Sequence, residues 1–336
     1  MTTLREIVKI AWDAEHHGDL ESAVYWYKEA VNFCNGNGDT DGELMYMSNL
    51  AEIQSRIGQL QEAVETATRL LVSARKNRLE IYEMRASGRL AEVLLLIDPR
   101  GRWEEVKPLL QSGLKTAKQT ETTYWQIYFL TLMAQGYIHS KNFNDAYACL
   151  QEATIHLSPT VDDPKHLQSR VFWLLALLML EVYNYSEART YAEQAIGVAK
   201  EDGVLDFVAK AQLILAQVEL AQEQFVEAFG IVESVNIQAK SFRWKLVEQT
   251  AEYLRGELAR RLNYLDIAEA ASSRSLFLAR EMKTVENEVK SLLGLGQVML
   301  VLHRREEASD LIMQAQKLSQ EQNYGDHLAK TIELLD

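Results

Sequence analysis

A short run of acidic and amide residues has the spacing with which a metal site could begin. Asn37, Asp39 and Asp41 are followed by Gly42, as in the first half of a calcium-binding loop. The twelfth position of such a loop needs a glutamate that binds the ion through both oxygens, and here it is Ser48. The sequence therefore predicts no calcium site, because a required ligand is missing.

Other patterns of reactive residues are absent from the sequence. It has no glycine-rich phosphate loop that ends in lysine, no histidine pair at metalloprotease spacing and no cysteine pair at zinc spacing. His16 and His17 are neighbours on an expected helix, so their side chains point in different directions. We therefore predict no catalytic residue, no metal ion and no cofactor, and a protein that is not an enzyme.

An alanine recurs at a nearly constant interval along the whole chain. These anchor positions are Ala23, Ala63, Val106, Ala146, Ala188, Ala228, Ala268 and Ala308. The intervals between them are 40, 43, 40, 42, 40, 40 and 40 residues. Such a period indicates stacked repeats, each of which buries its apolar face only against its neighbours. We therefore expect one continuous solenoid over residues 1–336.

Each repeat is expected to be a pair of antiparallel helices. Twelve residues before the anchors stand Ala11, Ala51, Leu94, Ala134, Ala176, Ala216, Gly256 and Gly296. Small side chains there let two helix axes approach to roughly 8–10 Å. The predicted fold is all-α, an α-α superhelix of eight helix-turn-helix repeats with a C-terminal capping helix. The repeats are predicted at about 4–38, 42–77, 82–118, 122–157, 165–201, 204–239, 243–282 and 284–322, with the cap at 324–336.

Charges and glycines place the turn inside each repeat. Cations or histidines precede most of these turns and acidic residues follow them, as the dipoles of the two helices favour. Gly18 and Gly58 are expected to end the first helix in a left-handed conformation. The third repeat has a longer turn, residues 98–101. Pro108 predicts that the second helix of that repeat begins late or is kinked.

These repeats resemble those of the tetratricopeptide family. Residues 18–31, Gly-Asp-Leu-Glu-Ser-Ala-Val-Tyr-Trp-Tyr-Lys-Glu-Ala-Val, are similar to the family's turn and second helix, and residues 143–146 and 185–188 are shorter matches. The usual unit has about 34 residues. The longer spacing here is more similar to the variant found in sensor domains of bacterial signalling ATPase regulators, including the maltose activator, and in the eukaryotic spindle-orientation adaptor. The resemblance implies a right-handed superhelix whose first helices line a concave groove.

The resemblance also implies which side chains face that groove. In the family register they lie at fixed distances from the small residue of each first helix, and here several are arginine, lysine, aromatic or amide side chains. Aromatic and arginine side chains are enriched in binding hot spots. The predicted partner-binding residues are Arg5, Trp12, Glu52, Arg56, Tyr128, Gln135, Arg170, Trp173, Lys210, Gln217, Tyr253, Glu257, Arg260, Lys290 and Gln297. The alternative is that they form only a solvated surface.

Two binding functions fit these features. The first is a scaffold or adaptor in signalling or regulation that holds a peptide or helix of a partner protein in the groove. That partner is expected to carry acidic groups opposite Arg170, Lys210 and Lys290. The second is a ligand-sensing module of a signalling or transcription regulator, with a small effector in the groove.

Composition limits the partners. The 35 basic and 48 acidic residues give a net charge of −13, which opposes direct binding to nucleic acid. The only two cysteines, Cys34 and Cys149, lie in different repeats and provide no disulfide framework, as in a reducing cytoplasm. The longest apolar run, residues 171–180, is too short to span a bilayer, and no signal peptide is recognisable. We expect a cytoplasmic protein without a membrane partner.

Two segments interrupt the regular pattern. Residues 158–164 contain two prolines, and we consider a hinge there between 1–158 and 165–336, with a tolerated surface loop as the alternative. The stretch from residue 324 begins like a ninth first helix and then stops. We expect it to shield the last apolar face, as terminal repeats do. Homodimerisation through an uncapped end is the alternative.

Overall fold

The computed structural model describes residues 3–157, 165–322 and 324–335, and within them every regular element is an α-helix. Pairs of successive helices form units 1 to 8, and a last helix follows them. The helices are α1 (Leu4–His16), α2 (Leu20–Gly36), α3 (Thr40–Arg56), α4 (Leu60–Lys76), α5 (Glu80–Ile97), α6 (Trp103–Gln119), α7 (Thr123–His139), α8 (Phe143–His156), α9 (Lys165–Glu181), α10 (Tyr185–Asp202), α11 (Leu205–Ala221), α12 (Phe225–Ser241), α13 (Lys245–Arg261), α14 (Leu265–Met282), α15 (Val285–Val301), α16 (Arg305–Glu321) and α17 (Gly325–Leu335). The prediction of an all-α superhelix of eight helix pairs with a C-terminal helix is confirmed.

The anchor residues hold the two helices of each unit together. All eight are completely buried, and each second helix begins three residues before its anchor. At Gly256, one of the small positions of the first helices, an added Cβ would clash with Ser272 of the second helix. Short side chains therefore set the distance between the helices, as the spacing predicted.

Left-handed residues end the first helices. Gly18 and Gly58 have φ angles of 77° and 83°, as predicted from the sequence. Residues other than glycine take the same conformation in later units, among them Lys141 and Tyr183. In unit 3, α6 begins three residues before Val106 like every other second helix, so the late start predicted from Pro108 is wrong. Pro108 lies inside this helix.

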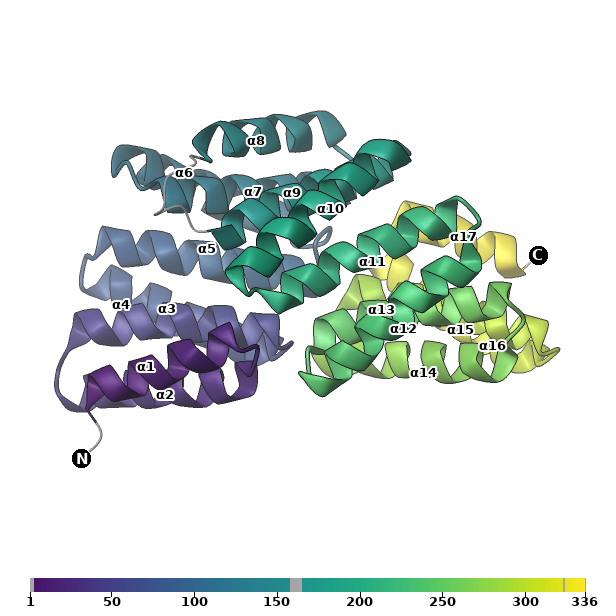
Figure 1. Ribbon diagram of the computed structural model, residues 1–336, viewed down its shortest axis with the longest axis horizontal. Coiled ribbons are helices and arrows are strands. Elements are labelled where there is room, and N and C mark those ends of the chain that lie inside the picture. The colour runs from purple at the N-terminus through teal and green to yellow at the C-terminus, as the bar shows by residue number, and fades with distance from the viewer. Residues whose placement is uncertain (1–2, 158–164, 323, 336) are drawn as a thin grey trace.

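The stack of units curves until its two ends meet. In Figure 1 the chain runs from α1–α4 at the lower left, over α6–α10 at the top, to α12–α16 at the lower right. The turn of unit 1 reaches the junction between α12 and α13, where a Cβ on Gly18 would lie 3.4 Å from the ring of Phe242 and 3.5 Å from Trp244. Trp244 is buried and stacks on Phe242 at 4.8 Å between ring centroids.

Units 2 and 3 make corresponding contacts one unit further along. The turn of unit 2 packs on the end of α14, with Leu60 and Met282 in one apolar cluster. The turn of unit 3 meets the start of α17, where Arg100 forms an ion pair of 2.6 Å with Asp326. The turn of unit 1 thus meets the junction after unit 6, the turn of unit 2 meets the junction after unit 7, and the turn of unit 3 meets the junction after unit 8. This register closes the superhelix on itself.

The C-terminal helix covers the end of the solenoid. Tyr324 and Leu334 join the apolar cluster of α15 and α16, so α17 covers the last unit as the predicted cap. The loop 158–164, where we considered a hinge, lies outside the described residues. Within the residues that are described, no helix combines the length and apolar character that crossing a membrane requires.

Candidate functional site

Closure of the superhelix leaves one cavity of about 490 Å³ in its interior. Its lining comes from the first helices of units 2 to 8, from the turns of units 3 and 4, and from α17. No second helix contributes a described residue to it. A more open hollow of about 410 Å³ shares Arg100, His139, Lys141 and Asp326 with the cavity, so it adjoins the cavity at the turn of unit 4. The first helices thus face inward, as the resemblance implied.

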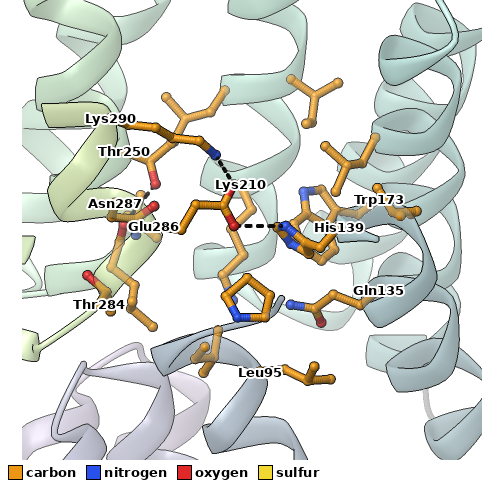
Figure 2. Close-up of a pocket in the computed structure, with 18 of the residues that line it drawn as sticks. Leu95, Gln135, His139, Trp173, Lys210, Thr250, Thr284, Glu286, Asn287 and Lys290 are labelled. Atoms are coloured by element: carbon orange, nitrogen blue, oxygen red, sulfur yellow. Dashed lines mark hydrogen bonds and ion pairs between the residues drawn. The ribbon is translucent and has the colours of Figure 1, made fainter. Parts of the chain in front are cut away.

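Seven of the predicted partner-binding residues line this cavity. They are Arg56, Gln135, Arg170, Trp173, Lys210, Gln217 and Lys290. They come from α3, α7, α9, α11 and α15, which the curvature brings around one space. Figure 2 shows Gln135, Trp173, Lys210 and Lys290 around it.

The other predicted residues lie elsewhere. Arg5 and Trp12 are exposed on α1, which does not reach the cavity. Glu52 pairs with Arg89, and Glu257 pairs with Arg260 at 2.7 Å, so these charges bind one another. The remaining three, which are also outside the lining, are Tyr128, Tyr253 and Gln297.

Tyr128 is buried rather than presented to a ligand. Its hydroxyl donates to Glu92 at 2.6 Å and accepts from Arg89 at 2.8 Å. It supports the cavity indirectly, because Glu92 also pairs with Arg170. The sequence correctly placed Tyr128 on a first helix, but in the structure its side chain packs against the neighbouring unit instead of facing the cavity.

Two cations in the cavity share one carboxylate. Nη2 of Arg56 lies 2.8 Å from Oδ1 of Asp206, and Nζ of Lys210 lies 3.2 Å from its Oδ2. Burial by itself would raise the pKa of Asp206, but Arg56 and then Lys210 hold that pKa well below its usual range. Arg56 also pairs with Glu15 at 2.8 Å, so it joins α1, α3 and α11.

A second ion pair lies beside the first. Nη1 of Arg170 lies 2.6 Å from Glu92, and its Nη2 lies 3.5 Å from Oε1 of Gln135. Burial opposes ionisation of Glu92, yet Arg170 and Arg89 outweigh it and lower the pKa of Glu92 to about 2. Both members of the pair are therefore charged at neutral pH.

A third charged group lies where the ends of the superhelix meet. Glu286 of α15 is 2.8 Å from Lys290, 3.6 Å from Arg100 and 3.4 Å from Nδ1 of His139. Figure 2 shows Glu286 between Lys290 and His139, which come from opposite walls. Burial opposes its charge, but Lys290 and His139 hold the pKa of Glu286 well below its usual range.

Sequence reasoning missed the residues that closure brings in. Arg100, His139 and Glu286 come from one turn and two helices that are far apart in the chain, and Asp326 comes from the cap. We interpreted residues 98–101 only as a turn. No local pattern shows that this turn meets the last unit, so no signal in one sequence would have found them.

Part of the wall is apolar. Trp173 meets the ring of Phe207 edge to face at 6.3 Å, and Phe207 lies 4.4 Å below Nζ of Lys210. Leu177 and Leu246 extend this surface. Because apolar and charged side chains line the same space, the arrangement can bind a group with both an apolar and a polar side.

Among the described residues no group of three or more His, Cys, Asp or Glu side chains could hold a metal ion.

The chain matches no protein-family model and no curated protein. Solved structures similar to it include a Rap protein complexed with competence and sporulation factor, 15% identical, with 86% of this chain and 80% of that chain covered and a TM-score of 0.65. NprR in complex with its cognate peptide NprX is 14% identical, with coverage of 89% and 84% and a TM-score of 0.60. A signal transduction ATPase with a tetratricopeptide repeat sensor, from Pyrococcus horikoshii, is 13% identical, with coverage of 93% and 49% and a TM-score of 0.57.

Another similar structure has the name of an enzyme. It is aspartyl phosphate phosphatase F from Bacillus subtilis, 12% identical over 99% of this chain and 95% of that chain, with a TM-score of 0.51. The fold alone therefore does not separate binding proteins from enzymes. What these similarities show is the architecture: the chain has the superhelical fold of tetratricopeptide-repeat proteins, as its repeats predicted.

Proposed function

We propose that this protein is a regulatory adaptor that binds a short peptide segment of a partner inside its superhelix. The observation that carries the proposal is the interior cavity, which collects side chains from seven first helices into one partly apolar, partly charged wall. A volume of about 490 Å³ lies within the range of roughly 300–1,000 Å³ of ligand pockets. No chemical step is part of this proposal.

The size of the cavity limits the bound segment to a few residues and leaves no room for several turns of helix. An α-helix about 10–12 Å across, with a rise of 1.5 Å per residue, fills roughly 120–170 Å³ per residue. The cavity of about 490 Å³ would therefore hold about three or four residues of helix. An extended segment can place a few side chains against the apolar wall and its backbone against polar groups.

Polar groups that could bind a peptide backbone lie along the cavity. The amides of Gln135, Gln217 and Asn287 come from α7, α11 and α15 and line it together. Asparagine and glutamine amides each offer donors and an acceptor, as a peptide group requires. The complex of NprR with its cognate peptide, which has the same fold, supports this proposal.

A small anionic effector is the second candidate. The same volume suits a molecule of that size, and charged side chains from α3, α9 and α11 meet in it. The protein would then be a sensor whose curvature depends on the effector. The two candidates share one site and differ in the chemistry of the occupant.

A selection with a blocked variant tests the main proposal. A library of displayed peptides of about eight residues is panned against the protein, and the selected peptides are titrated into wild type and into the double variant Gln217→Trp/Asn287→Trp, which fills the cavity. We expect the blocked variant to lose binding. Gln320→Trp, on the exposed side of α16, is the matched control and should bind like wild type. Equal affinity for the blocked variant would exclude the cavity as the peptide site.

A further inference from the structure

We propose that Arg56, Arg170 and Lys210 form a subsite for one anionic group of the ligand, either a carboxylate or a phosphate. This inference rests on the proposed function, because it assumes that the cavity receives a ligand. It assigns one place in the cavity to an acidic group of the partner that the sequence predicted. Lys290, which we grouped with Arg170 and Lys210 from the sequence, is not part of this subsite.

The three cations converge from distant parts of the chain. Arg56 ends α3, Arg170 lies in α9 and Lys210 lies in α11, and all three line the cavity. Their positions are held by carboxylates, since Asp206 binds Arg56 and Lys210 while Glu92 binds Arg170. A site whose cations are already fixed needs little reorganisation when an anion arrives.

The guanidinium groups keep donors that nothing uses. Nε of Arg56 and Nε of Arg170 are buried, and neither has a hydrogen-bond partner among the described residues. The side chain of Arg170 is only 10% exposed, and its Nη2 has only the long contact with Gln135. A buried donor without a partner is destabilising, because it has lost its hydrogen bonds to water. An anion that accepts from these donors would remove that penalty through charge-assisted hydrogen bonds.

The charges around Lys210 also favour an added anion. Burial lowers the pKa of Lys210, and Arg56 and Arg170 lower it further, so that Asp206 does not compensate for them. Lys290 behaves differently, because Glu286 outweighs burial and raises its pKa. Asp206 therefore offsets the effects of burial and of the two arginines less fully at Lys210 than Glu286 offsets burial at Lys290. Of the two lysines, Lys210 is the one that gains from an anionic ligand.

The cluster also has a structural role that a test must separate from binding. The Arg56–Asp206 pair joins unit 2 to unit 6 and so contributes to closure. A variant that merely loosens the fold would lower the melting temperature with or without an anion. The informative quantity is instead the dependence of the melting temperature on anion concentration, from which an apparent Kd follows.

The probes are sodium phosphate, sodium acetate, and the tripeptide Ala-Ala-Ala with either a free C-terminal carboxylate or a C-terminal amide. Each is titrated at constant ionic strength, with sodium chloride as the reference salt. The variants are Lys210→Met and Arg170→Gln. Lys210→Arg keeps the charge, and Lys115→Gln removes an exposed cation of α6 that lies outside the cavity.

We expect phosphate or a carboxylate to stabilise the wild type more than chloride does, and the free tripeptide to bind more tightly than its amide. Lys210→Met and Arg170→Gln should each weaken this binding at least tenfold, while Lys210→Arg and Lys115→Gln stay within threefold of wild type. A lower Kd for phosphate than for the carboxylates would identify a phosphorylated group as the occupant, and the reverse order a carboxylate.

Two results would overturn the subsite. One is stabilisation by the anions that does not exceed that by chloride, and the other is an unchanged Kd in both Lys210→Met and Arg170→Gln. If one of these variants fails to fold, the other variant and the pair of free and amidated tripeptides on the wild type still decide. If the library peptides lose binding to the blocked variant but bind equally with a free and with an amidated C-terminus, the subsite is overturned and the proposed function stands. If the anions bind but no library peptide depends on the cavity, the proposed function is overturned and the subsite stands.

Discussion

The hydroxyl of Tyr324 donates a hydrogen bond to Asp98, a residue 226 positions earlier in the chain. Both residues are buried, and they join the start of α17 to the turn between α5 and α6. Asp98 also accepts from the backbone N–H of Gly101 at 2.8 Å, so one carboxylate shapes the turn and receives the cap. This contact is part of the closure that encloses the cavity.

Removing the hydroxyl of Tyr324 should weaken closure. We expect Tyr324→Phe to lower the free energy of unfolding by about 1–3 kcal/mol, because Asp98 stays buried with one partner fewer. Urea denaturation measures this change. Tyr264→Phe alters an exposed tyrosine and should have no effect. Equal stability of Tyr324→Phe and wild type would show that the contact does not hold the ends together.

Packing, rather than surface charge, should hold unit 1 to the junction of units 6 and 7. Trp244→Ala removes a buried ring next to Gly18, and we expect a loss of about 3–5 kcal/mol. Arg243→Ala breaks an exposed ion pair of 2.6 Å with Glu21, for which about 0–1 kcal/mol is expected. Small-angle scattering should show a larger radius of gyration for Trp244→Ala only. The reverse ranking of the two variants would contradict this account of closure.

Two glycines inside helices should respond to alanine in opposite directions. A Cβ at Gly136 of α7 would clash with the ring of Trp103, so Gly136→Ala should destabilise the protein by about 1–3 kcal/mol. Gly230 of α12 has no atom within 4 Å of such a Cβ. Gly230→Ala should therefore stabilise the protein by about 0.5–1 kcal/mol, because glycine is a poor helix former. Thermal melts of the two variants check both signs, and a stabilised Gly136→Ala would show that α6 and α7 are not as tightly packed.

The buried pair of Glu92 and Arg170 should make stability depend on pH. The pKa of Glu92 is lowered to about 2 in the folded protein, from about 4.5 when unfolded. Its contribution, on the order of 3 kcal/mol, is therefore present above pH ~4.5 and is lost as the pH falls toward 2. Glu92→Gln should be less stable than wild type at pH 7, and this difference should shrink between pH ~4.5 and ~2.

Denaturation of both proteins across that pH range measures the difference. Glu193→Gln, at an exposed position of α10, is the control and should follow wild type at every pH. If the difference in the free energy of unfolding between Glu92→Gln and wild type stays constant with pH, Glu92 does not titrate with a lowered pKa.

Local sequence features were enough for the elements and for part of the site. The recurring small residues at 40-residue spacing predicted the helix pairs, and all eight anchors are buried. Because each unit repeats the same face, residues of the first helices such as Gln135, Arg170 and Lys210 were expected to face inward, and they line the cavity. Arg5 and Trp12 failed the same rule, since α1 stands at the end of the stack.

What the sequence by itself determined is the unit: two helices, their crossing point and the side that faces inward. These follow from residues within one period, which are close in the chain. Only the tertiary structure decided that the turn of unit 3 meets α17, that Arg56 reaches Asp206, and that the expected groove is a cavity inside the superhelix. The physical reason is that curvature is the sum of small rotations between successive units. Each rotation depends on packing between neighbours, and their sum sets which distant units meet.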